Sequence, residues 1–278
     1  TAVAVSPSPI VLTENATTAV AVTATITDQN GCGNVISSGS IQFVLYRTSV
    51  AATSSCTFDG NACYTGYATF TVQASDTCDG GTDTSANVST TIPVWYVADP
   101  TDSSSTFSAD WWAGYVKAID FSNASSAATS VTAVELNTLT GLTVTAAIGY
   151  GTLSSGQDTG STNQTATTTN TGNSKIDIEF SGTDMSSSAL TIAATNQRYG
   201  TSTAAYGSLS YQLTNTGTWR NINVYDATVT TTPSTSSTYW GIVAPTGTTA
   251  AAYTGTNTFT AVAQVGVGRQ REPRGQPE

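Results

Sequence analysis

The chain has 278 residues, a formal net charge of −10, no histidine and only 9% charged residues, and its 55 Thr and 33 Ser make up about a third of it. Without histidine, a Ser-His-Asp triad, a Cys-His dyad and histidine ligands for zinc are all excluded. Eight Lys and Arg residues against 18 Asp and Glu residues offer no basic surface to nucleic acid, whereas 24 aromatic residues favour a folded chain over a disordered one.

The first twelve residues, 1–12, form an apolar segment that two prolines divide. Ala2, Val3, Ala4 and Val5 precede Ser-Pro-Ser-Pro, after which come Ile10, Val11 and Leu12. Such a strand could leave its own sheet and add to an exposed sheet edge of the next subunit through main-chain hydrogen bonds. A head-to-tail contact of this kind is heterologous and grows an open filament. The alternative, a simple first strand of the first sandwich, remains open.

Residues 13–98 alternate apolar and hydroxyl side chains with period two. In Ala19–Thr27, for example, Val20, Val22, Ala24 and Ile26 share one face while threonines fill the other. The same pattern predicts strands over Ile41–Leu45, Ala68–Val72 and Val88–Val97, where Pro93 indicates an edge or bulge position. Strands at this spacing, separated by turn residues, predict an antiparallel β-sandwich domain.

All four cysteines, Cys32, Cys56, Cys63 and Cys78, lie in this domain. An even number confined to one domain predicts two disulfides and therefore an oxidising compartment outside the cell. Of the three possible pairings we favour Cys56–Cys63, which flank an Asp-Gly-Asn turn, together with Cys32–Cys78. The start at Thr1 is typical of a mature, processed N-terminus, and no membrane-spanning run is visible.

Acidic residues surround the predicted Cys32–Cys78 bridge. If this bridge forms, it brings together oxygen ligands of the kind that Ca²⁺ prefers, from Asp28, Asn30, Asp76, Asp79 and Asp83. The alternative is that these residues only build turns. No other metal or cofactor is required by the sequence.

We interpret the polar segment 99–105 as a hinge, followed by a second β-sandwich domain over 106–267. The carboxylates Asp99, Asp102 and Asp110 could hold an ion between the two domains. The tail 268–278 breaks the composition and reads as lying outside the fold. Alternating residues predict the strands of the second domain: Val131–Leu136, Leu142–Tyr150, Lys175–Phe180, Leu190–Ala194, Leu209–Leu213, Asn221–Val224, Tyr239–Val243 and Phe259–Val265.

Three stretches carry a resemblance to a known class of proteins: Val94–Ser104, Thr171–Asp184 and Tyr239–Val262, which includes the pattern P-x-G-T-x-x-x-x-Y-T-G-x-x-x-F-T-A from Pro245 to Ala261. Over residues 5–265 the chain resembles the Ig-like modules of secreted surface proteins of archaea and of uncultivated small-genome bacteria. The resemblance implies two tandem Ig-like sandwiches and a cell-surface role as a surface-layer, filament or stalk subunit.

Other candidate sites have competing interpretations. Asp177 and Glu179 lie two apart in a strand, as glycosidase carboxylates could, but we expect their face to meet water while Ile176, Ile178 and Phe180 pack inside. The aromatic residues Trp111, Trp112, Tyr115, Trp219, Tyr225, Tyr239 and Trp240 could stack on sugars or fill cores. Asn-x-Ser/Thr sequons occur at Asn15, Asn87, Asn123 and Asn163.

Together these patterns predict a non-enzymatic, extracellular glycoprotein that polymerises with copies of itself into a filament or surface layer. The alternative is an adhesin or carbohydrate-binding module whose aromatic face binds cell-surface glycans. We expect no nucleic-acid partner and no membrane span.

Overall fold

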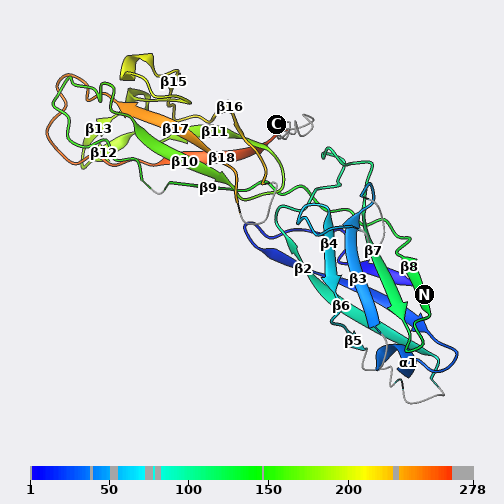
Figure 1. Ribbon diagram of the computed structural model, residues 1–278. Helices are drawn as coiled ribbons and strands as arrows, with labels where there is room; N and C mark the ends of the chain where they lie inside the picture. Colours follow the sequence, from blue (N-terminus) through cyan, green and yellow to red (C-terminus); the bar gives the residue numbers. More distant parts are fainter. Residues whose placement is uncertain are drawn as a thin grey trace, which may run out of the picture.

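The computed structural model of the chain describes residues 2–37, 40–50, 56–72, 78, 83–145, 147–227 and 232–264. Figure 1 shows an elongated molecule with one group of strands at each end. Its regular structure is almost all antiparallel β-sheet, which confirms the predicted all-β class. The predicted tail lies outside the described residues.

The N-terminal group of strands, here called the first sandwich, has two sheets with the orders β1-β2-β6-β5 and β4-β3-β7-β8. This is the strand order of the immunoglobulin fold, in which strands A, B, E and D face C′, C, F and G. The bounds are β1 Val3–Ser6, β2 Thr17–Thr27, β3 Ser40–Arg47, β4 Cys63–Tyr67, β5 Thr71–Val72, β6 Ser85–Trp95, β7 Trp112–Ile119 and β8 Ser125–Thr129, with one helical turn, α1, at Gly33–Ile36.

Period-two alternation places the core of this sandwich. The even-numbered residues of β2 from Val20 to Ile26 are buried, as predicted, and pack on the facing sheet at Phe43, Leu45 and Val116. Each aliphatic side chain buried in this way contributes roughly 1.5–3 kcal/mol. The hydroxyl residues between them face outward, where β-branched threonine suits the pleat.

Pro93 lies within β6, which has strands on both sides. Tyr96 donates its N–H to the carbonyl of Ala16, so the even-numbered residues of this part of β6 hydrogen-bond to β2. The nitrogen of an odd-numbered residue such as Pro93 therefore points away from β2. On that side β5 reaches only Ser89 and Val88. Proline is tolerated because this part of an inner strand has one open side.

The first sandwich extends further along the chain than we predicted. β7 pairs along its whole length with β3, and Trp112, Val134 and Leu136 belong to the same core as Val20. The residues from 106 to 136, which we assigned to a second domain, therefore belong to the first sandwich. The segment predicted as a hinge runs inside it, since Thr101 donates to the carbonyl of Leu136 and Asp99 is buried.

The C-terminal group, here called the second sandwich, has the sheet orders β15-β14-β17-β10-β9 and β16-β11-β18, with a separate β12-β13 hairpin. Its core contains the packed rings of Phe180, Tyr199 and Trp240. The bounds are β9 Leu142–Val144, β10 Gln164–Asn170, β11 Ile176–Gly182, β12 Met185–Ser187, β13 Leu190–Ile192, β14 Gln197–Gly200, β15 Tyr211–Gln212, β16 Thr218–Val224, β17 Thr235–Ile242 and β18 Asn257–Ala263, with 3-10 turns at Ala194–Asn196 and Tyr206–Ser208.

The two sandwiches have separate hydrophobic cores. Whether each folds as an independent domain stays a prediction. Within the described residues, no helix has the length and the apolar character needed to cross a membrane.

Candidate functional site

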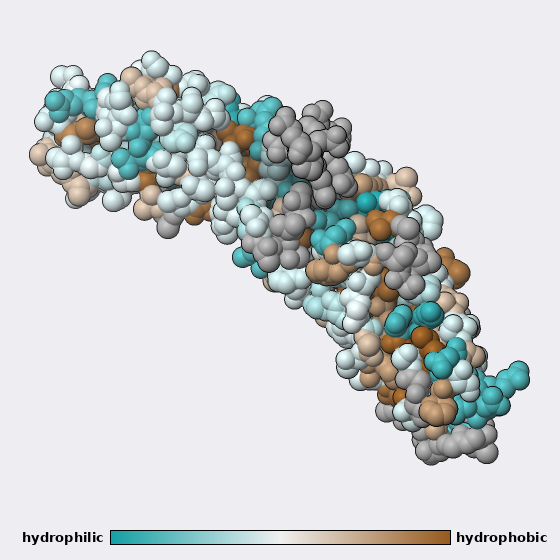
Figure 2. All heavy atoms as spheres, in the orientation of Figure 1, coloured by the Kyte–Doolittle hydropathy of each residue, from teal (hydrophilic) through white to brown (hydrophobic). Residues whose placement is uncertain are grey.

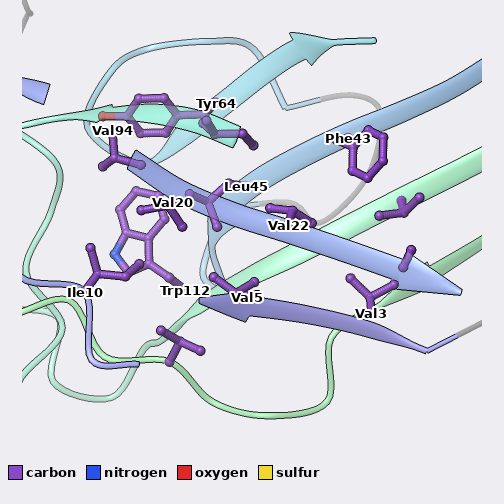
Figure 3. Packing of buried hydrophobic residues seen from close by; sticks show 14 of the residues in the cluster. Val3, Val5, Ile10, Val20, Val22, Phe43, Leu45, Tyr64, Val94 and Trp112 are labelled. Atoms are coloured by element: carbon purple, nitrogen blue, oxygen red, sulfur yellow. The ribbon is translucent and has the colours of Figure 1, made fainter. Parts of the chain in front are cut away.

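The most informative features for function are two sheet edges, one in each sandwich. The first is β1, which pairs with β2 in the register Val3↔Ala24 to Ser6↔Ala21 and is the outermost strand of its sheet. Val3 and Val5 are buried while Ala2 and Ala4 are exposed. Figure 3 shows Val3 and Val5 pointing into the same core as Val22 and Leu45.

Gly114 of β7 leaves space for side chains of β1 and for Val22 of β2, whose Cγ1 would lie 2.9 Å from a Cβ built on Gly114. A Cβ built on Gly114 would lie 3.0 Å from Val5 Cγ2 and 3.3 Å from Val3 Cγ1, too close for an unstrained fit. The N-terminal strand therefore has a fitted place in its own sandwich, which is the simpler of the two interpretations that the sequence left open.

The linker after β1 is exposed from Ser6 to Pro9. The chain is held again at Ile10, which is fully buried and forms an isolated parallel bridge with Leu136, outside the named strands. Ile10 donates its N–H to the carbonyl of Glu135, and Asn137 donates to the carbonyl of Ile10. The contacts that hold residues 10–12 are therefore separate from those that hold β1.

The second edge is β18, which pairs with β11 on one side. Thr183 donates to the carbonyl of Thr256, and Gln264 donates to the carbonyl of Lys175. In an antiparallel ladder, hydrogen-bonded and non-hydrogen-bonded residue pairs alternate. The main-chain groups of the even-numbered residues of β18 therefore hydrogen-bond to β11. The main-chain groups of Asn257, Phe259, Ala261 and Ala263 then point to the other side, where the described residues provide no paired strand.

A groove of about 390 Å³ lies beside the N-terminal half of β18. Its other wall includes Thr145, Ala147 and Ile148, which follow β9. Ile148, Tyr150 and Phe259 are partly buried against the core of the second sandwich. No lining residue is charged. The full lining is Val144, Thr145, Ala147, Ile148, Tyr150, Met185, Gln197, Tyr253, Thr254, Gly255, Thr256, Asn257 and Phe259.

Burial raises the pKa of the Tyr150 phenol at this groove, although a side-chain hydrogen bond with Asn257 opposes the shift. The phenol donates to Gln197 Oε1 at 2.8 Å, and Asn257 Nδ2 donates to the same oxygen at 2.9 Å. The polar groups of the groove therefore satisfy one another, and Tyr150 stays neutral at physiological pH.

The disulfides are Cys32–Cys78 and Cys56–Cys63, the pairing that we favoured, with Cα atoms 5.8 and 6.2 Å apart. In the second bridge the Asp59 carboxylate accepts the N–H groups of Asn61, Ala62 and Cys63, so the predicted turn forms between the two cysteines.

The calcium prediction falls only partly on described residues, because Asp76 and Asp79 lie outside them. Asp28 Oδ1 accepts the N–H of Asn30 at 2.7 Å, which is the turn geometry of the alternative interpretation. The carbonyl of Asp83 accepts the N–H of Cys32. In the part of the chain that the structure describes, no group of three acidic or thiol side chains is placed to hold a metal, and the calcium site stays a prediction.

The carboxylates Asp99 and Asp110, which we considered for an ion site, meet a cation of the chain itself. Arg47 Nε lies 3.1 Å from Asp99 Oδ2, and its Nη1 contacts Asp110 and Ser49. The guanidinium also lies 3.7 Å from the centre of the Phe107 ring. Asp102 lies apart and accepts hydrogen bonds from Ser104 and Thr138. The sequence did not suggest Arg47 as the partner, because it is remote in sequence from these carboxylates.

Asp177 corrects the expectation that the carboxylate face of β11 meets water, since it is 1% exposed. Its Oδ1 accepts the N–H groups of Ile222 and Asn223, each at 3.1 Å, and its Oδ2 accepts Gln264 Nε2. The carboxylate thus satisfies the main chain of β16 where its register against β11 shifts. Asp177 therefore has a structural role, and the paired carboxylates do not share one open face.

The aromatic candidates divide into core and surface residues. Trp112 and Trp240 are fully buried, whereas Trp111, Trp219 and Tyr225 are exposed by 40, 51 and 51%. Trp219 is opposite Glu179 in the pairing of β16 with β11, and Lys175 Nζ lies 4.7 Å from the centre of the Tyr225 ring. Tyr115 and Tyr239 are half-buried.

Among the sequons, Asn15 and Asn123 are exposed at positive φ, in turns where a glycan has room. Asn87 is exposed in β6, and its Oδ1 accepts Thr25 Oγ1. Asn163 is half-buried, and its amide bonds to the main chain of Ala204 in both directions. Glycosylation remains a prediction, for which Asn15 and Asn123 are the most accessible sites.

Comparison of this chain with protein-family models and with curated protein sequences finds no match.

Proposed function

We propose that this chain is an extracellular structural subunit that assembles with copies of itself into a filament or surface layer. The observation that carries the proposal is the position of β1: an edge strand joined to the rest of its sandwich by an exposed, proline-containing linker. An edge strand held in this way can add to the sheet of a neighbouring copy while Ile10 and the residues after it stay in place.

Two further properties support an external location. Both disulfides belong in an oxidising compartment. Figure 2 shows that most side chains on the visible face of the second sandwich have hydropathies near the middle of the scale, where Thr and Ser lie. A surface of hydroxyl groups with few lysines and arginines offers few cleavage sites to trypsin-like proteases.

Electron microscopy of the purified chain tests the proposal. Concentrated protein should form filaments or sheets, and a variant lacking residues 1–9 should remain folded but monomeric. Circular dichroism serves as the control that the shortened variant keeps its sheets. Assembly that persists after the deletion would contradict strand addition by β1, and dispersed monomers of the intact chain at every concentration would contradict the proposal itself.

A second candidate function is carbohydrate binding, favoured by Trp219 and Tyr225, which are half exposed on the second sandwich. Exposed rings of this kind stack on sugar faces. A glycan array should then give hits that Trp219→Ala abolishes and that Trp111→Ala, on the first sandwich, retains. Equal binding by both variants would contradict this function.

A further inference from the structure

We propose that the open edge of β18, with the groove beside it, is the site to which residues Ala2–Ser6 of a second copy add as an extra strand. This inference rests on the proposed self-assembly and names the acceptor. We call the site, formed by Asn257–Ala261 and the groove-lining residues Val144, Thr145, Ala147, Ile148 and Tyr150, the acceptor edge.

The first argument is a comparison of the two sandwiches. In the first, β3 is flanked by β4 and β7, and β8 covers the outer side of β7. In the second, β11 is flanked by β16 and β18 in the same way, but among the described residues no strand covers the outer side of β18. The groove borders this outer side of β18 only along its N-terminal half, at Asn257 and Phe259, so part of one more strand could enter it there.

The second argument is that this edge lacks the protection that folded proteins commonly give to a sheet edge. Sheet edges are normally protected by charges, prolines or a covering segment because they pair readily with other chains. Asn257–Ala263 contains no charged residue and no proline. Phe259 and Ala261 are only partly buried on the core side, so an added strand would cover apolar surface as well as main-chain groups.

The third argument concerns the occupant. Ala2–Ser6 is uncharged, as is the lining of the groove, so no ion is buried when the two meet. Its valines at positions 3 and 5 alternate with small residues and can face the core side of the new partner while Ala2 and Ala4 face water. Figure 1 shows β1 in the first sandwich and β18 in the second, so one molecule presents the donor and the acceptor in different halves. Joining them between copies gives a head-to-tail contact that propagates.

The same strand has two competing positions. Within one molecule, Val3 and Val5 fill the space beside Gly114. In the polymer they leave that space, which has a cost, and gain the acceptor edge of a neighbour. Because only the second arrangement involves two molecules, assembly should depend on concentration, and dilute protein should stay monomeric.

A matched pair of proline substitutions tests the acceptor edge on the intact chain. Ala261 of β18 has its N–H on the open side, so Ala261→Pro removes an outward donor and leaves the ladder to β11 intact. Ala127 of β8 has the same residue type and the same outward position on the open edge of the first sandwich, because Asp120 donates to the carbonyl of Ala124. Ala127→Pro is therefore the control.

We expect the wild type and Ala127→Pro to assemble equally in sedimentation velocity and electron microscopy, and Ala261→Pro to lose at least tenfold in assembly while its melting temperature matches that of the control. Wild-type polymers that Ala261→Pro forms equally well would overturn the inference and leave the proposed function standing. A wild type that never assembles would overturn both. Loss of assembly in Ala261→Pro together with full assembly after deletion of residues 1–9 would overturn the choice of occupant and point to another segment, such as 265–278.

Discussion

At the scale of single residues, a notable feature of the first sandwich is a buried cation, Arg47. Arg47 is 6% exposed and contacts two carboxylates and an aromatic ring, while the indole N–H of Trp112 donates to the carbonyl of Asp99 at 3.0 Å. Removing one partner of a buried ion pair leaves the other charge in a medium that solvates it poorly.

The first prediction concerns this cation. Arg47→Met should lower the free energy of unfolding by about 3–5 kcal/mol, because the buried carboxylate of Asp99 loses its cation. Arg47→Lys should keep only part of the stability that Arg47→Met loses, because an ammonium group cannot contact both carboxylates as the planar guanidinium does. Urea denaturation measures both. The double variant Arg47→Met, Asp99→Asn is the control: it should be more stable than Arg47→Met alone, and equal stability would contradict the role of charge.

The second prediction is a pH dependence at Asp102. Partial burial raises the pKa of this carboxyl, but the hydrogen bonds from Ser104 and Thr138 together lower it by more. The pKa therefore lies below its ordinary value. A carboxyl whose pKa is lowered in the folded state stabilises the fold when the pH is above the ordinary pKa of the group. This contribution is lost as the pH falls through the lowered, folded-state pKa.

Asp102→Asn should therefore cost about 1 kcal/mol near neutral pH, and the difference from wild type should shrink below about pH 4. Melting temperatures of both proteins between pH 7 and pH 3 measure it. A difference that stays constant over this range would show that the charge of Asp102 contributes nothing.

The sequence was a limited guide to individual residues because their partners are remote in the chain. The cysteine pairing was accessible, since an Asp-Gly-Asn turn lies between Cys56 and Cys63. The burial of Asp177 was not, because its partners on β16 are brought close only by an irregular register that no periodicity encodes.

At the scale of elements, period-two alternation located strands such as β2, β3 and β11, in which apolar residues mark one face, but it did not identify β7. It missed β10, whose sequence Gln-Thr-Ala-Thr-Thr-Thr-Asn has no apolar alternation although Ala166 and Thr168 are buried. It also predicted too much: Val131–Leu136 forms only isolated bridges, and the strand expected over Leu142–Tyr150 ends at Val144. In that second case the alternation is present in the sequence, but apolar side chains such as Val144 and Ile148 line the groove, and the chain after Val144 does not pair as a strand.

The third prediction separates the two disulfides, which constrain loops of different length. Cys32–Cys78 spans 46 residues and Cys56–Cys63 spans 7, so in the chain-entropy account they stabilise the fold by about 4 and about 2 kcal/mol. Replacing each pair with serine should lower the free energy of unfolding in this order. Thermal unfolding of both double variants measures it, and a larger loss from the short loop would contradict the entropic account.

At the scale of the whole molecule, the two sandwiches are joined by side-chain amides. Asn173, in the loop between β10 and β11, donates to the carbonyls of Ala98 and Asn137 at 3.0 and 3.2 Å and accepts the N–H of Leu139 at 2.7 Å. Beside it, a Cβ on Gly172 would collide with the carbonyl oxygen of Leu139. The junction is thus closely packed and held by directional hydrogen bonds.

The last prediction tests whether these amide bonds hold the sandwiches together. Asn173→Ala should leave two buried carbonyls and one N–H without their partner, each costing about 1–3 kcal/mol if water does not replace the amide. The two carbonyls and the N–H belong to the first sandwich, whereas Asn173 belongs to the second. Losing these hydrogen bonds should therefore let the two sandwiches move more freely relative to each other. Small-angle X-ray scattering should then show a broader distribution of distances than in the wild type.

Asn170→Ala is the matched control. Asn170 is also buried and donates to three carbonyls, those of Ser174, Val224 and Tyr225, but all of them lie in the second sandwich. This variant should lower the melting temperature and leave the scattering profile unchanged. If both variants scatter like the wild type, the side-chain amide of Asn173 does not hold the junction. The remaining contacts across it would then do so: the main-chain bonds from Asn15 to Thr171 and from Asn173 to Leu139, and the apolar packing of Tyr96, Val97 and Ala227.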